Sequence, residues 1–190
     1  MNLKEEILKE HSKKQCDAIV KYIGSDKKRF AELMKLFFEG EYRVTQRAAW
    51  PMSYCVRNHP ELIAPYFSRL INNLAKKKLH DAVIRNTVRL LQDVDVPKRF
   101  HGKLMNICFD FILSNETAVA IKVFSLTILQ NLSAFYPEII PEIKLIIEER
   151  WEHETVAFRS RAKKILKKES RDKEQESRGK KQKTIRGRKN

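Results

Sequence analysis

The chain has 190 residues, and its 39 Lys or Arg against 24 Asp or Glu give a formal net charge of +15 at pH 7. No apolar run approaches the length of about eighteen residues that a membrane-spanning helix needs, so we exclude a membrane protein. With only 5 Gly and 6 Pro, the chain also has too few turn-forming residues for a sandwich or barrel of many short strands. The composition therefore predicts an all-α fold.

The N-terminal segment predicts a helix and no targeting signal. Residues 1–9 read MNLKEEILK, with acids among the apolar positions, whereas a secretory signal needs a continuous apolar segment. We therefore expect a cytoplasmic protein. The pattern from Leu3 to Ile23 predicts one leading helix that Gly24 ends. This helix would cap the open side of the units that follow.

Four segments of the chain share a short pattern. Each begins with an acidic residue, reaches a Val, and has a polar or basic residue three positions after the Val. The shared valines are Val44, Val83, Val119 and Val156, at spacings of 39, 36 and 37 residues. A period of this length is typical of stacked helical units.

Each period divides into two helices, because apolar residues recur at spacings of three and four. The first helices cover roughly residues 30–37, 62–74, 104–112 and 139–147, and the second helices roughly 44–55, 83–91, 119–129 and 156–166. Asp81 and Thr117 lie where two second helices begin, so we expect them to cap these helices. With the leading helix, the pattern predicts about nine helices.

The segment Val44-Thr-Gln-Arg47-Ala48-Ala49 resembles the Val-x-x-Arg-Ala-Ala pattern of the HEAT repeats, an armadillo-like family. The resemblance covers roughly Lys27 to Lys168 and implies a short right-handed solenoid of helical hairpins. Pro51 departs from the family, which carries its proline in the first helix. Because proline lacks a backbone donor and crowds the carbonyl four residues earlier, we expect a kink or a restart of the second helix there.

The composition changes near residue 167. Residues 167–190 hold eleven Lys or Arg, four Asp or Glu and a single large apolar residue, Ile185. Such a segment buries too little apolar surface to offset the entropy of ordering. We therefore predict a HEAT-like domain with an N-terminal capping helix over residues 1–168 and a disordered basic tail over residues 169–190.

Basic residues recur at one position of the repeat and form the candidate ligand-binding site. They are Arg47, Lys122 and Arg159, and in a solenoid the second helices line the concave surface. Arg43, Arg85 and Arg89 could extend this basic stripe. In the family, an acid near the start of the second helix bonds a basic residue about six positions later, and Glu41–Arg47 and Glu116–Lys122 have this spacing. The structural alternative, which we favour, is therefore a ladder of internal bonds between these residues.

Two further groups of residues have a functional and a structural interpretation. The first group contains four aromatic residues that lie near basic residues: Trp50, Tyr54, Trp151 and Phe158. In nucleic-acid-binding proteins, aromatic residues beside basic ones stack on bases. HEAT-like DNA glycosylases combine aromatics, Arg and an acid in a concave cleft. The structural alternative, which we favour, places them in the core. Asp93 and Asp95 could act as paired carboxylates, but their place before Pro97 favours helix capping.

The sequence contains no motif of an enzyme class, such as a glycine-rich phosphate loop or a Gly-x-Ser-x-Gly turn. Cys16, Cys55 and Cys108 are far apart, which predicts buried thiols and excludes a CxxC zinc site. The histidines are equally scattered, so we expect no metal and no cofactor. We therefore predict a monomeric, non-enzymatic binding or scaffold module for a protein partner. The alternative is a nucleic-acid-binding protein, related in mode to the DNA glycosylases, that uses a basic concave face and the basic tail.

Overall fold

The computed structural model describes residues 1–76 and 79–167, and these residues form helices and connecting turns without a strand. The predicted tail, residues 169–190, lies outside the described residues. The α-helices are α1 (Leu3–Lys9), α2 (Lys13–Ile23), α3 (Lys27–Glu39), α4 (Tyr42–Asn58), α5 (Phe67–Leu74), α6 (Asp81–Leu91), α7 (His101–Leu113), α8 (Val119–Leu132) and α9 (Ile140–Arg150). Three 3-10 helices precede α5, α7 and α9, namely η1 (Pro60–Tyr66), η2 (Lys98–Phe100) and η3 (Pro137–Ile139). A final helix covers residues 156–167.

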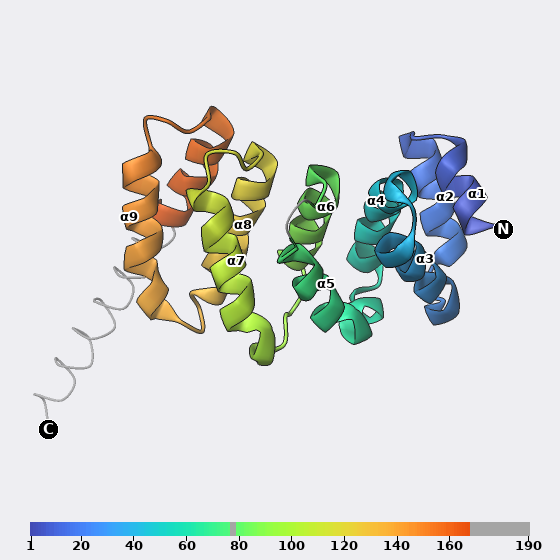
Figure 1. Ribbon diagram of the computed structural model, residues 1–190. Coiled ribbons are helices and arrows are strands. Elements are labelled where there is room, and N and C mark those ends of the chain that lie inside the picture. The colour runs from blue at the N-terminus through green and yellow to red at the C-terminus, as the bar shows by residue number, and fades with distance from the viewer. Residues whose placement is uncertain (77–78, 168–190) are drawn as a thin grey trace, which may run out of the picture.

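The helices pair into hairpins that stand side by side along the molecule (Figure 1). The hairpins are α3 with α4, α5 with α6, α7 with α8, and α9 with the final helix. The predicted all-α solenoid of helical hairpins is confirmed. The second helices α4, α6 and α8 pack directly against one another in a row, whereas α3, α5, α7 and α9 make few contacts among themselves.

The leading segment forms two helices, so the prediction of one leading helix was wrong. The chain leaves the helical conformation at Glu10 and re-enters it after Ser12, whose hydroxyl accepts a hydrogen bond from the backbone N–H of Gln15. A serine that caps the next helix supplies this stop-and-start signal. The predicted end at Gly24 is confirmed, because Gly24 has φ +50°, a conformation that favours glycine.

The second helices begin differently from the sequence prediction. His80 caps α6, with its Nδ1 accepting from the N–H of Ala82 at 2.9 Å, and Asp81 is the first residue inside the helix. There its carboxylate lies in the first turn, where the helix dipole favours negative charge. Helix α8 begins after Ala118 without a side-chain cap, so Thr117 does not cap it. Helix α4 runs through Pro51 without restarting.

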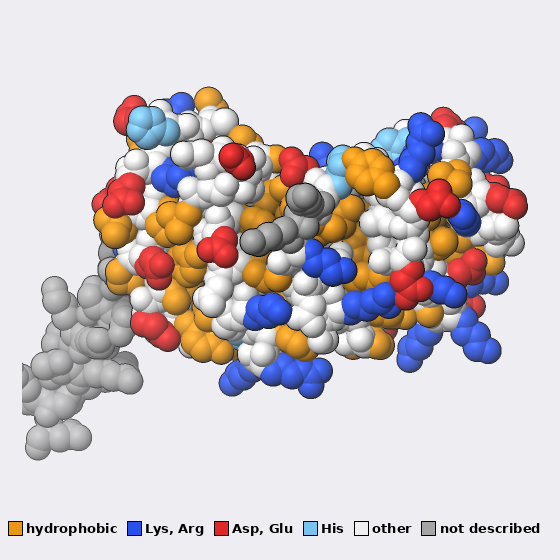
Figure 2. All heavy atoms as spheres, viewed as in Figure 1, with side chains coloured by type: hydrophobic (Ala, Val, Ile, Leu, Met, Phe, Trp, Pro, Cys, Tyr) orange, Lys and Arg blue, Asp and Glu red, His pale blue; other side chains and the backbone are white. Residues whose placement is uncertain are grey.

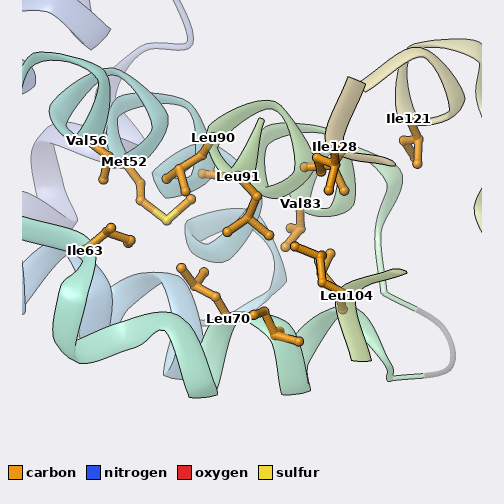
Figure 3. Packing of buried hydrophobic residues seen from close by; sticks show 14 of the residues in the cluster. Met52, Val56, Ile63, Leu70, Val83, Leu90, Leu91, Leu104, Ile121 and Ile128 are labelled. Carbon is orange, nitrogen blue, oxygen red and sulfur yellow. The ribbon is translucent and has the colours of Figure 1, made fainter. Parts of the chain in front are cut away.

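One apolar core runs between the first and second helices through all the hairpins. Figure 3 shows its middle, where Ile63, Leu70 and Leu104 face Met52 and Leu91 across the hairpins. Each fully buried Leu or Ile contributes about 1.5–3 kcal/mol relative to an exposed position. Because every hairpin buries its apolar stripe against the next, the second helices are held in a fixed register and present one continuous face.

The three cysteines are free and buried. Burial raises the pKa of the Cys16 thiol to about 11 and the pKa values of the Cys55 and Cys108 thiols to about 12. Because the thiolate is the reactive form, we expect none of these thiols to react with an aromatic disulfide reagent in the native protein near neutral pH. All three should react after unfolding in guanidinium chloride. A thiol that reacts rapidly in the native protein would contradict the packing of its helix.

Within the described residues, no helix is long and apolar enough to cross a membrane. The same part of the chain contains no cluster of three His, Cys, Asp or Glu side chains that could hold a metal ion.

Candidate functional site

A hollow of about 470 Å³ lies on the face of the second helices. Its aromatic residues are Trp50, Tyr54 and Phe124, its basic residues are Arg85 and Arg89, and the rest of its lining is His11, Gln46, Ala82, Asn86 and Ala120. No Asp or Glu is among these lining residues. We call this site the basic-aromatic hollow.

The helical period explains why these side chains meet. Trp50 and Tyr54 are four residues apart on α4, as are Arg85 and Arg89 on α6, and residues at this spacing share one face of a helix. Since α4 and α6 pack side by side, the aromatic pair and the arginine pair become neighbours. The small Ala82 leaves room between them.

Tyr54 organises the basic side of the hollow. The Arg89 guanidinium lies over the Tyr54 ring, 5.2 Å from its centre, and Nη2 lies 3.5 Å from the phenolic oxygen. The Lys13 ammonium lies 4.7 Å from the centre of the same ring. The hydrogen bond from Arg89 and its charge lower the pKa of Tyr54 below its ordinary value, with smaller contributions from Trp50 and Lys13. The Tyr54 ring therefore has two cationic side chains against it on this side of the hollow.

The remaining groups of the hollow differ in how firmly they are held. Trp50 is half-buried, and its ring meets the His11 ring edge to face at 5.3 Å. Asn86 is buried and donates to the carbonyl of Ala82 at 2.8 Å. Arg85 is exposed and makes no ion pair or side-chain hydrogen bond with another described residue. Its charge is thus available to a ligand.

A comparison of the sequence with models of known families agrees with this row of paired helices. A family model described as HEAT repeat domain matches residues 3–169. The chain belongs to the HEAT repeat family. Searches among curated proteins and among solved structures gave no match. HEAT repeats are commonly protein-interaction scaffolds, and the family is typically non-enzymatic.

Two of the six basic residues predicted for the HEAT concave face, Arg85 and Arg89, meet in the hollow. Arg47 instead donates to the carbonyl of Leu8 at 2.8 Å and so ties the C-terminal end of α1 to α4. Arg43 is exposed and Arg159 half-buried, and neither lines the hollow. The basic stripe of the sequence prediction is therefore interrupted in the structure.

Lys122 points into the HEAT core and is 4% exposed. Its ammonium donates to Glu154 Oε1 at 2.6 Å, and Arg150 Nε donates to the same oxygen at 2.9 Å. The expected pairing of Glu116 with Lys122 is therefore wrong, as is that of Glu41 with Arg47. Lys122 is buried and Arg47 half-buried. Both make internal bonds, as the ladder interpretation required, but their partners come from other helices and loops.

The aromatic residues divide between core and surface. Phe158 is fully buried, in agreement with the core interpretation, and Trp151 packs at the edge of the core with Lys163 over its ring. Trp50 and Tyr54 are half-buried and line the hollow, so the core interpretation was wrong for their exposed faces. Sequence reasoning did not find His11 or Phe124. The repeat pattern around Val119 placed Phe124 on a second helix, but it did not predict that Phe124 would line the hollow.

Asp93 and Asp95 do not cap a helix. Pro97 precedes η2 at the capping position, and no side chain caps that helix. Both aspartates are exposed, and neither makes an ion pair or side-chain hydrogen bond with another described residue.

Proposed function

We propose that this chain is a protein-binding module that holds an acidic segment of a partner protein in the basic-aromatic hollow. The observation that carries the proposal is the meeting of Arg85 and Arg89 with Trp50, Tyr54 and Phe124 in a site whose lining has no carboxylate. Aromatic residues and Arg are the residues that dominate protein interfaces energetically. The HEAT architecture supports the proposal, because the second helices form one continuous face.

The extent of the positive charge favours a protein segment over a long nucleic acid. On α8 the hollow is lined by Ala120 and Phe124, and Lys122 is internal. The face seen in Figure 2 is not uniformly basic either: Asp and Glu side chains gather over the end of the molecule where α9 lies, and Lys and Arg lie toward the N-terminal half and the lower edge. A polyanion needs a continuous basic track, whereas two arginines beside three aromatics suit a few acidic and apolar side chains.

Selection from a random peptide library with the full chain as bait tests the proposal. We expect enriched peptides to combine Asp or Glu with aromatic or large aliphatic residues. The double variant Arg85→Ala/Arg89→Ala should bind the selected peptide about tenfold or more weakly, because charge-assisted hydrogen bonds are lost. The matched control Arg43→Ala/Arg57→Ala removes two exposed arginines of α4 that lie outside the hollow, and it should retain the affinity. Enrichment of neutral or basic peptides, or equal loss in both double variants, would refute the proposal.

Nucleic-acid binding is the second candidate, because the half-buried rings of Trp50 and Tyr54 line the hollow beside Arg85 and Arg89, and aromatic and basic side chains together bind single strands. Each phosphate contact with a single strand contributes about 0.7 units to the slope of log affinity against log salt. If a single-stranded oligonucleotide binds through the hollow, the Arg85→Ala/Arg89→Ala variant should flatten this slope by about 1.4 units. Tight, salt-steep binding with that loss would replace the protein proposal. Base excision of the glycosylase type has no support in the lining of the hollow, because it contains no acid.

A further inference from the structure

A second cavity, of about 600 Å³, differs from the basic-aromatic hollow in the charge of the residues that line it. It opens where α6 and α8 end, beside the loop that leads to η2. None of its lining residues is Lys or Arg, although the chain carries 39 of them. Two carboxylates, Asp93 and Asp95, lie at its edge without a cationic partner among the described residues. We call this site the acceptor pocket.

Two buried acceptors in the wall of the acceptor pocket also lack a donor. His101 is 2% exposed, and its Nε2 lies 2.6 Å from the carbonyl oxygen of Val96. Because a carbonyl can only accept, Nε2 carries the proton in the neutral ring and Nδ1 is left as an acceptor. That Nδ1 has no hydrogen-bond partner, and neither has the buried Oε1 of Gln92. Unpaired buried acceptors are costly, and these two add to the excess of acceptors over donors in the residues that line the pocket.

The backbone adds to the negative potential of this pocket. Helix α6 ends at Leu91 and α8 at Leu132, and residues of both C-terminal turns line the cavity. The C-terminal end of a helix carries unpaired carbonyls and partial negative charge, which favours cations. Residues of two such helix ends, two aspartates and the two residues with unpaired acceptors thus line one pocket.

Phe135 gives the pocket a selective element. It is 59% exposed, lines the cavity, and its ring centre lies 5.4 Å from that of His101. An aromatic face attracts a guanidinium through its quadrupole and by stacking. Leu91, Leu104 and Leu132 supply an apolar wall along which an alkyl chain can lie. The arrangement suits a side chain with an apolar stem and a planar head that carries several donors.

We propose that the acceptor pocket binds the side chain of an arginine presented by a peptide segment of a partner protein. The guanidinium donates to the carboxylates of Asp93 and Asp95 and stacks on Phe135, while its stem lies along the apolar part of the lining. Arginine fits better than lysine, because its rigid fork of donors pairs with two carboxylates at once. This proposal is independent of the basic-aromatic hollow, since the two sites share no lining residue.

Titration of the full chain with short blocked peptides tests the inference. The probes are Gly-Gly-Arg-Gly-Gly and its lysine and citrulline counterparts, and the measurement is NMR chemical-shift perturbation with calorimetry. We expect the arginine peptide to bind with shifts at Phe135 and His101, the lysine peptide to bind more weakly, and the uncharged citrulline peptide not to bind. Equal binding of the citrulline peptide, or shifts confined to other surfaces, overturns the proposal.

Variants make the test specific to the carboxylates. Asp93→Asn/Asp95→Asn should weaken binding of the arginine peptide by about tenfold to a hundredfold, as expected for the loss of charge-assisted hydrogen bonds. Phe135→Leu should weaken it less and narrow the preference for arginine over lysine. The control Asp110→Asn changes an exposed acid of α7 that lies outside the pocket, so its affinity should equal that of the parent chain. Unchanged binding by the double Asn variant, with its fold intact by circular dichroism, refutes the site.

Discussion

Replacing Glu154 with Leu should lower the free energy of unfolding by about 3–5 kcal/mol, because it strands a buried cation. The Glu154 side chain is 4% exposed and the Lys122 side chain 5%, and they are joined at 2.6 Å. Without the carboxylate, the Lys122 ammonium must remain charged in the core or lose its proton. Urea denaturation monitored by circular dichroism measures the effect.

The double variant Lys122→Met/Glu154→Leu is the matched control for this prediction. It removes both charges and should recover most of the stability, because well-packed apolar residues often replace a buried ion pair without loss. Arg150 keeps its hydrogen bonds to the carbonyl of Leu113 and to Asn115 Oδ1 in that variant. A second control, Glu152→Leu, alters an exposed neighbouring acid and should change stability by less than about 0.5 kcal/mol. If Glu154→Leu costs no more than Glu152→Leu, the buried pair does not exist in solution.

The same cluster gives the protein a defined sensitivity to acid. Burial by itself would raise the pKa of Glu154, but the hydrogen bonds from Lys122 and Arg150 outweigh it and hold the pKa below the ordinary value of 4.5. A carboxyl whose pKa is lowered on folding stabilises the fold above its unfolded pKa and loses that contribution as the pH falls through the folded pKa. The contribution of Glu154 should therefore be fully present at neutral pH and disappear in the acid range below 4.5. In the double variant this part of the pH dependence should be absent.

Gly40→Ala should destabilise the protein by about 1–3 kcal/mol, the range for overpacked sites. Gly40 has φ −68°, which any residue adopts, so backbone conformation is not the reason. A Cβ there would lie 2.4 Å from the carbonyl oxygen of Leu36 and 2.8 Å from Val44 Cγ1. The turn between α3 and α4 needs glycine because backbone and the first buried valine of the repeat approach it closely. Thermal unfolding measures the loss.

Gly102 offers a control with the opposite sign. It is exposed within α7, and an added Cβ would meet nothing within 4 Å. Gly102→Ala should therefore stabilise the protein by about 0.5–1 kcal/mol through helix propensity alone. If Gly40→Ala is also neutral or stabilising, α3 and α4 are not as close at this turn as the structure places them.

The repeat period was enough to predict the hairpins, because apolar spacing along one helix is a local property of the sequence. The partners of the two cations that make internal bonds were not predictable in this way. Lys122 bonds a residue 32 positions later, and Arg47 bonds a carbonyl 39 positions earlier. The family's six-residue spacing suggested nearer partners, and only the packing of different hairpins decides between them.

Part of the candidate site was also predictable, because it depends on spacing along a single helix. Arg85 and Arg89 share a helix face by spacing alone, and their place on a second helix followed from the repeat. His11 was missed because the break between α1 and α2 was missed, and this break depends on the capping serine Ser12. The acceptor pocket depends on residues of four different segments, so no local pattern could indicate it.

The uneven contact between the two rows of helices determines how the molecule can bend. The row of α4, α6 and α8 is in continuous contact and resists extension, whereas the first helices contact one another little. When the solenoid bends, the row of second helices should therefore keep its length, and the first helices should move apart or closer together. Arg85 and Phe124 lie on the row that keeps its length. The spacing of groups in the basic-aromatic hollow should thus stay constant while the ends of the solenoid swing.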